Sequence, residues 1–181
     1  SGALKWAFIG PLAGALIRPL GGWLSDRVGG ARVTLWNFAV MFLAGVAVLL
    51  SLPSSPDGND VTGFFAAFML LFITSGIGNG SVFHVVPSVF RKLHERAAER
   101  KDTAAQKAAR AAGAVEASVA LGFTSAIAAL GLFFIPAFVA TSIQTTGSAH
   151  LAISVFSLFY VSCLVATWWW YLRRNAEVKC R

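Results

Sequence analysis

The sequence predicts an all-α fold, a polytopic membrane helix bundle, and two observations support this class. Of the 181 residues, 56% are hydrophobic and only 13% are charged, which leaves too few charges for the surface of a soluble domain of this size. In addition, the apolar runs are long enough to cross about 30 Å of hydrocarbon. We expect five spans, at about 3–24, 33–52, 62–90, 114–140 and 150–172.

The positive charges lie on one side of the predicted bundle. The turn 25–32, the segment 91–113 and the tail 173–181 hold 13 of the 15 Lys and Arg residues, whereas the connections 51–61 and 140–150 hold none. Because basic connections remain in the cytoplasm, we expect the N-terminus outside and the C-terminal tail inside, in the cell inner (plasma) membrane. The first residue is Ser1, and we interpret the chain as part of a longer one.

The first span, about 3–24, contains Arg18 in the middle of its apolar residues. An arginine at the centre of a membrane helix costs about 2.5–3.5 kcal/mol even on insertion scales. The positions three and four residues away have little side-chain bulk; they are Gly14, Ala15, Gly21 and Gly22. We therefore predict that Arg18 binds a small anion in a cavity. The alternatives are an arginine that reaches the interface or pairs with a carboxylate for structure.

The turn after this span contains Asp26 and Arg27 between pairs of glycines. Asp26 can accept hydrogen bonds from a helix N-terminus or a neighbouring arginine, although an ordinary polar turn fits the same residues. In the second span, Asn37 lies near the cytoplasmic end, where we expect a structural hydrogen bond.

The third span places a distinctive set of residues on one helical stripe: Gly76, Asn79, Phe83 and Pro87. An amide and an aromatic ring suit the wall of a cavity for a planar oxyanion, whereas close packing of a glycine-rich helix is the simpler alternative. His84 is about 100° around the helix from Phe83. We expect it to point elsewhere and to make a structural hydrogen bond rather than to carry protons.

The last two spans are predicted to have structural roles. In the fourth, small residues at helical spacing predict a seam for tight helix contact; they are Ser118, Gly122, Ser125 and Ala129. The fifth ends in an aromatic belt, Trp168–Tyr171, that anchors it at the interface. The basic segment 91–113 is rich in helix formers, so we expect it to extend the third span as a solvated helix near anionic headgroups.

Other function classes find no support in the sequence. It contains no paired-carboxylate site, nucleophile elbow or nucleotide-binding loop, so we predict no enzyme and no cofactor. The histidines have no metal-ligand spacing, and Cys163 and Cys180 do not form a disulfide framework. Segment 91–113 has no aromatic residues among its charges, which argues against nucleic acid as a partner.

Three segments resemble the nitrate/nitrite porter family of the major facilitator superfamily: GPLAGALIRPLGGWLSDRVGGARVT, GIGNGSVFHVVPSVFR and ALGFTSAIAALGLFFIP. GWLSDRVGG is similar to the cytoplasmic loop motif of the superfamily, in the copy found in the C-terminal half. The arginine in GALIRP and the ALGF segment are more particular to the nitrate porters. The resemblance implies a partial C-terminal half of a major facilitator fold, about the last five of twelve helices.

By this resemblance, Arg18 is one of two arginines that bind the anion, and Phe83 is an aromatic residue of the substrate site. Gly122 falls in a signature whose glycines let helices slide. Ala128 and Leu132 stand where that signature often has glycine, which bears on the detail of gating.

Together these observations predict a transporter of nitrate or nitrite by alternating access. Arg18, Asn79 and Phe83 are the predicted binding residues. The gating residues are predicted to be Asp26, Arg27, Gly122 and Ser125. The partners are the anion, the bilayer and the missing N-terminal half, without which we expect no transport. A facilitator for another small anion, such as a carboxylate, and a non-transporting scaffold or relic remain as alternatives.

Overall fold

The computed structural model describes residues 8–52, 61–98 and 103–173, and most of these residues are helical. The helices are α2 (Ile9–Val28), α3 (Gly30–Ser51), α4 (Val61–Ala97), α5 (Thr103–Thr146) and α6 (His150–Thr167), and α6 continues into the π-helical turn η1 (Trp168–Leu172). No strand occurs in the described ranges, so the predicted all-α class is confirmed.

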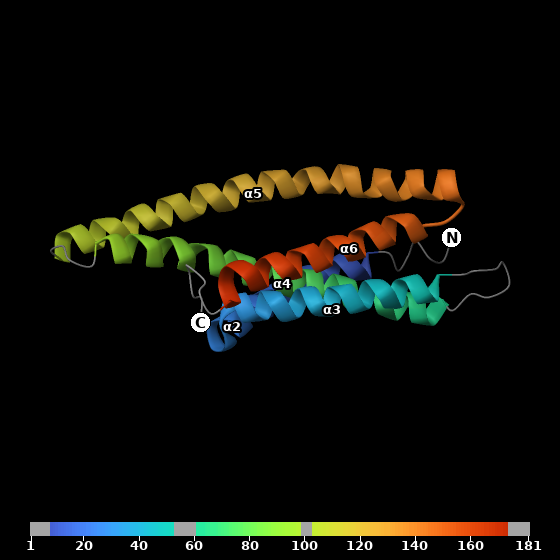
Figure 1. The fold of residues 1–181 in the computed structure, drawn as a ribbon, viewed down its shortest axis with the longest axis horizontal. Helices are drawn as coiled ribbons and strands as arrows, with labels where there is room; N and C mark the ends of the chain where they lie inside the picture. The colour runs from blue at the N-terminus through green and yellow to red at the C-terminus, as the bar shows by residue number, and fades with distance from the viewer. Residues whose placement is uncertain (1–7, 53–60, 99–102, 174–181) are drawn as a thin grey trace.

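Helix α4 is the centre of the bundle. It packs against α2 on one side and α3 on another, and α6 packs against α3 (Figure 1). The long helix α5 runs along the outside and contacts α4 and α6. Near the end of α5, Phe138 meets Phe156 of α6 with ring centroids 5.9 Å apart.

Four helical segments in the described residues are long and apolar enough to cross a membrane, as expected of a multi-pass membrane protein. They are Gly30–Ser51, Thr62–Ala97, Thr103–Thr146 and His150–Leu172. Helix α2 has 20 residues, but Arg18, Asp26 and Arg27 make it more polar than the others. The most polar helix of the bundle is therefore the one that carries the predicted anion-binding arginine.

The basic segment 91–113 does not simply extend the third predicted span. It is divided between two helices, because α4 ends at Ala97 and α5 already begins at Thr103. These ends project beyond the rest of the bundle as an antiparallel pair (Figure 1). Two ion pairs join them, His94 Nε2 to Glu116 Oε2 at 2.9 Å and Arg110 Nε to Glu95 Oε1 at 3.0 Å.

Glycines bring the backbones of α2 and α4 into direct contact. A Cβ atom added at Gly80 would overlap the carbonyl oxygen of Arg18, and one added at Gly76 would overlap that of Gly14. A Cβ at Gly21 would likewise overlap the carbonyl oxygen of Ile77. Close packing of the glycine-rich third span is thus observed, and it occurs at the level of Arg18.

Buried hydroxyl groups hold α2, α3 and α4 together next to the contact at Gly80. The Ser81 hydroxyl is fully buried and lies 2.9 Å from the hydroxyls of both Ser25 and Thr34. Asn37 is also buried and donates to the sulfur of Met41 at 3.4 Å, in agreement with the structural role expected of it. The hydrogen bonds of Ser81 to Ser25 and Thr34 join different helices, and in an apolar membrane such bonds fix the relative rotation of the helices.

The small-residue seam of α5 does not make the tight helix contact that was predicted. All four of its residues are exposed, and a Cβ atom added at Gly122 would meet nothing within 4 Å. The contact of α5 with α4 instead includes Gly113, where an added Cβ atom would lie 3.2 Å from His94 and from the carbonyl oxygen of Phe90. Small residues mark a face that allows close approach, but within the described ranges no helix occupies this face.

Candidate anion-binding site

A pocket of about 410 Å³ lies between α2 and α4. Helix α2 contributes Arg18, Pro19 and Gly22, and α4 contributes Asn79, Gly80, Phe83 and His84. The structure therefore places all three predicted binding residues around one cavity. Arg18 is exposed and Phe83 is 51% exposed, so the pocket is open on one side.

The local sequence explains how these side chains come together. The absence of a side chain at Gly80 lets α4 approach the backbone of Arg18 directly. Asn79 is next to Gly80 on α4, and Phe83 is about one turn further along. The close approach at Gly80 therefore brings both side chains near Arg18. On α2, Gly22 leaves space beside the guanidinium, because a Cβ added there would meet nothing within 4 Å.

Arg18 has no carboxylate partner among the described residues. The ion pairs observed in these ranges join His84 to Asp26, His94 to Glu116 and Arg110 to Glu95. A structural pairing of Arg18, one of the alternatives drawn from the sequence, is therefore not observed in this part of the chain. The guanidinium keeps its planar set of five donors for another group.

His84 does not point away from the pocket, so that expectation was wrong. It lines the same cavity as Phe83, and its Nε2 atom lies 2.8 Å from Oδ1 of Asp26. The face of α4 that borders the pocket is wider than a single helical stripe. It is centred on Gly80, where the backbones of α4 and α2 touch. The arc of α4 around Gly80 also includes the position four residues later, which is His84. The sequence gives this spacing of four residues, but it does not give the width of the arc that α2 covers, so it did not predict the location of His84.

The predicted gating residues are spread over the molecule. Asp26 pairs with His84, whereas the guanidinium of Arg27 lies 4.2 Å from the ring centroid of Trp23. Gly122 and Ser125 lie on the exposed face of α5 and do not line the pocket. The role predicted for Gly122 and Ser125, to permit one half of the carrier to rock against the other, stays a prediction.

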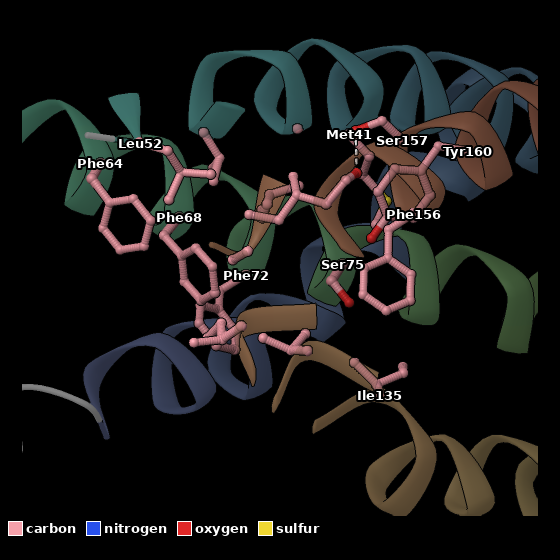
Figure 2. Close-up of a pocket in the computed structure, with 17 residues that line it drawn as sticks. Met41, Leu52, Phe64, Phe68, Phe72, Ser75, Ile135, Phe156, Ser157 and Tyr160 are labelled. Carbon is pink, nitrogen blue, oxygen red and sulfur yellow. Dashed lines mark hydrogen bonds between the residues drawn. The ribbon is translucent and has the colours of Figure 1, made fainter. Parts of the chain in front are cut away.

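A second cavity of about 600 Å³ lies among α3, α4, α5 and α6 (Figure 2). Aromatic and aliphatic side chains line most of it, including Phe64, Phe68, Phe72, Ile135 and Phe156 (Figure 2). Among the described residues its few polar side chains are those of Ser75, Ser157 and Tyr160, and none of the residues that line it is cationic. Such a lining cannot replace the hydration of an anion, so the pocket at Arg18 is the better candidate.

No protein-family model matches the chain. Comparison with curated proteins finds 42% identity over 176 residues to the nitrate/nitrite transporter NarU of Escherichia coli and 43% over 174 residues to its Salmonella typhimurium counterpart. The chain is similar to part of these proteins, which are named nitrate/nitrite transporters. A probable nitrate/nitrite antiporter of Thermus thermophilus, NarK2, is 34% identical over 178 residues.

These alignments cover nearly all of the chain but a minority of each transporter. They include 97%, 96% and 98% of the chain, which spans only 38%, 37% and 35% of the length of the respective relatives. The resemblance found in the sequence is thereby confirmed, over a minority of the length of these relatives.

Proposed function

We propose that this chain is the C-terminal part of a carrier that moves nitrate or nitrite across a membrane by alternating access. The observation that carries the proposal is the pocket that joins Arg18, Asn79 and Phe83 in a chain whose relatives are named nitrate/nitrite transporters. Substrate binding by these three side chains is part of the proposal.

Each group has a distinct role in binding. The planar fork of the Arg18 guanidinium makes two charge-assisted hydrogen bonds to two oxygens of a flat oxyanion. The Asn79 amide donates a further hydrogen bond, and the Phe83 ring supports the flat face of the anion. The bound anion in turn compensates Arg18 for its lost hydration.

The open side of the pocket suits a carrier in which this segment is one part of a whole. A facilitator carrier has its site between two halves, and here the other half would close the pocket beside Arg18. The exposed α5 face with Gly122 and Ser125 offers a smooth surface on which the halves rock. Asp26 and Arg27 hold the end of α2 during that motion, and the chain alone does not transport.

The charge pattern supports an orientation with the basic ends of α4 and α5 in the cytoplasm. Arg91, Lys107 and Arg110 are exposed there, and lysine and arginine are retained on the cytoplasmic side. The carrier then lies in the cell inner membrane, with the α5–α6 turn outside. The proposed activity is transport and involves no enzymatic step.

Counterflow into proteoliposomes tests the proposal. The full-length carrier that contains this segment is reconstituted into vesicles loaded with nitrate, nitrite, formate or acetate, and uptake of labelled nitrate is followed. We expect internal nitrate or nitrite to drive uptake and the carboxylates to fail. Drive by carboxylates alone would favour a facilitator for another anion, and no exchange with any anion would favour a scaffold.

A further inference from the structure

The cavity of about 600 Å³ among α3, α4, α5 and α6 runs along the helices. Helix α4 lines it from Phe64 to Ser75, and the segment that leads into and along α6 lines it from Ala149 to Tyr160. At a rise of about 1.5 Å per residue, each stretch is about 16 Å long. This length is close to half of the roughly 30 Å hydrocarbon core of a bilayer, which is the depth of one leaflet.

One end of this cavity lies where the helices end. Phe64 is in the first turn of α4, and Ala149 directly precedes α6, so both lie on the side of the α5–α6 turn (Figure 1). The other end, at Ser75 and Tyr160, lies well inside the helices. The cavity therefore extends from one surface of the bundle to about the middle of the membrane.

The walls of the cavity are apolar side chains that support one another. On α4, the rings of Phe64 and Phe68 stack with centroids 5.4 Å apart, and Phe68 meets Phe72 edge to face at 5.5 Å. These rings follow one another along the cavity (Figure 2). Helix α5 adds aliphatic side chains at helical spacing, namely Ile135, Val139 and Ile143. Such walls suit a long, flexible, apolar ligand.

The hydroxyl groups of the cavity gather at its inner end. Ser75, Ser157 and Tyr160 lie there, whereas Phe64 lies at the opposite end (Figure 2). The Ser157 hydroxyl already donates to the carbonyl oxygen of Ile153 at 2.9 Å. The inner end thus differs chemically from the rest of the cavity, and its hydroxyls can report which part of a ligand reaches it.

The apolar lining also limits what can occupy the cavity. An apolar cavity of about 150 Å³ in a soluble protein stays dry and binds benzene instead, and the present cavity is larger. If it were empty, the atoms of its walls would lose their dispersion contacts on that side. Around a multi-pass membrane protein, the apolar groups available to restore these contacts are the acyl chains of lipids.

We propose that this cavity binds one acyl chain of a phospholipid from the leaflet on the side of the α5–α6 turn. The chain lies parallel to the helices, with its methyl end beside Ser75 and Tyr160 and its headgroup at the membrane surface. It fills the space between α5 and the rest of the bundle. The inference is independent of the anion pocket, because the two cavities share no lining residue among those described.

Photolabelling in vesicles tests the proposal. The full-length carrier is reconstituted into vesicles of phosphatidylethanolamine and phosphatidylglycerol that contain a trace of phosphatidylethanolamine with a diazirine at the methyl end of one acyl chain. Light expels dinitrogen and leaves a carbene, which inserts into a neighbouring O–H or C–H bond, and mass spectrometry locates the labelled residue. Leu43 of α3, which is 63% exposed and does not line the cavity, serves as the reference for contact with bulk lipid.

Two variants fill the inner end of the cavity from different helices, Ser75→Phe from α4 and Ile135→Trp from α5 (Figure 2). The matched control is Ser162→Phe, because Ser162 is exposed on α6 and does not line the cavity. Thermal unfolding shows which variants retain the fold. If one filling variant does not fold, the other tests the same end of the cavity.

We expect the label at Tyr160 and at Leu43 in the wild type and in Ser162→Phe. In the filling variants, labelling of Tyr160 relative to Leu43 should fall about tenfold, because the added ring overlaps the place of the methyl end. A wild type labelled at Leu43 but not at Tyr160 would overturn the proposal and indicate that another part of the carrier fills the cavity. Equal labelling of Tyr160 in all the folded proteins would also overturn it, because lipid would then reach Tyr160 from outside the cavity. Neither outcome depends on nitrate binding.

Discussion

Arg18 is a charged side chain in an otherwise apolar part of α2, and it faces a pocket rather than an acidic partner in the described residues. In hydrocarbon its retention requires compensation by another group or by water. The pocket offers room for that group beside an amide and an aromatic ring. An exchangeable anion explains the arrangement better than a permanent ion pair, which this part of the chain does not provide.

The two asparagines of the described helices, Asn37 and Asn79, allow the binding role to be separated from a structural one. Asn79 lines the pocket, whereas Asn37 is 7% exposed and packs against Gly78. We expect Asn79→Ala to weaken nitrate binding about tenfold, the effect of one hydrogen bond to a charged group, with an unchanged melting temperature. Asn37→Ala should lower the melting temperature and leave affinity unchanged. Titration calorimetry measures the nitrate affinity, and thermal unfolding in detergent measures the melting temperature. Weaker affinity in Asn37→Ala, with a lower melting temperature in Asn79→Ala, would refute this view of the pocket.

The sequence predicts that Arg18, Asn79 and Phe83 share a site. The prediction comes from the charge of Arg18 in an apolar span, the stripe that carries Asn79 and Phe83, and the family resemblance. It does not predict the place of His84. The helical period gives the angle between two residues of one helix, but not the width of the arc that a neighbouring helix covers. That width depends on the direct backbone contact at Gly80, which only the packed structure shows.

At the scale of the helices, the site depends on the contact between α2 and α4. Its glycines cannot be replaced without moving backbone, since the atoms they would meet are carbonyl oxygens of Arg18, Gly14 and Ile77. A shift of α4 along α2 would also separate Asn79 from Arg18. We therefore expect the contact to serve both stability and the proposed binding.

Two glycine substitutions test this view. Gly80→Ala forces a methyl group against the Arg18 carbonyl oxygen, and we expect a destabilisation of about 1–3 kcal/mol, typical of overpacking. Gly122→Ala adds a methyl group where nothing lies within 4 Å, and alanine favours helix. Thermal unfolding of the full-length carrier should show a lower melting temperature for Gly80→Ala alone. Equal losses in both variants would show that the α2–α4 contact has no special role.

The sequence identifies the helical segments more reliably than it identifies which helices pack against one another. Hydrophobic length sets the positions of the helices, and this property is local. The seam of Ser118, Gly122, Ser125 and Ala129 is equally visible in the sequence, but all four residues are exposed in the described part of the chain. A pattern of small residues shows which face of a helix allows close packing. It does not show which helix packs there, least of all when that helix belongs to another part of the protein.

For the whole molecule, the charge asymmetry predicts a single orientation in the membrane. In a cysteine-free background of the full-length carrier, Ala108→Cys reports on the basic α4–α5 end and Thr145→Cys on the opposite end of α5; both positions are exposed. A membrane-impermeant maleimide added to intact cells should label only Thr145→Cys, because basic segments remain in the cytoplasm. Labelling of Ala108→Cys should require permeabilised cells. The reverse pattern would invert the topology.

The central claim is that the guanidinium of Arg18 binds the transported anion, and nitrate affinity of Arg18→Lys in the full-length carrier tests it most directly. Lysine keeps the positive charge but lacks the planar fork. Arg32→Lys is the matched control, since Arg32 is exposed at the start of α3 and does not line the pocket. We predict that calorimetry finds nitrate affinity about 10- to 100-fold weaker in Arg18→Lys, from the loss of a charge-assisted hydrogen bond, and unchanged in Arg32→Lys. Wild-type affinity in a normally inserted Arg18→Lys carrier would contradict the account.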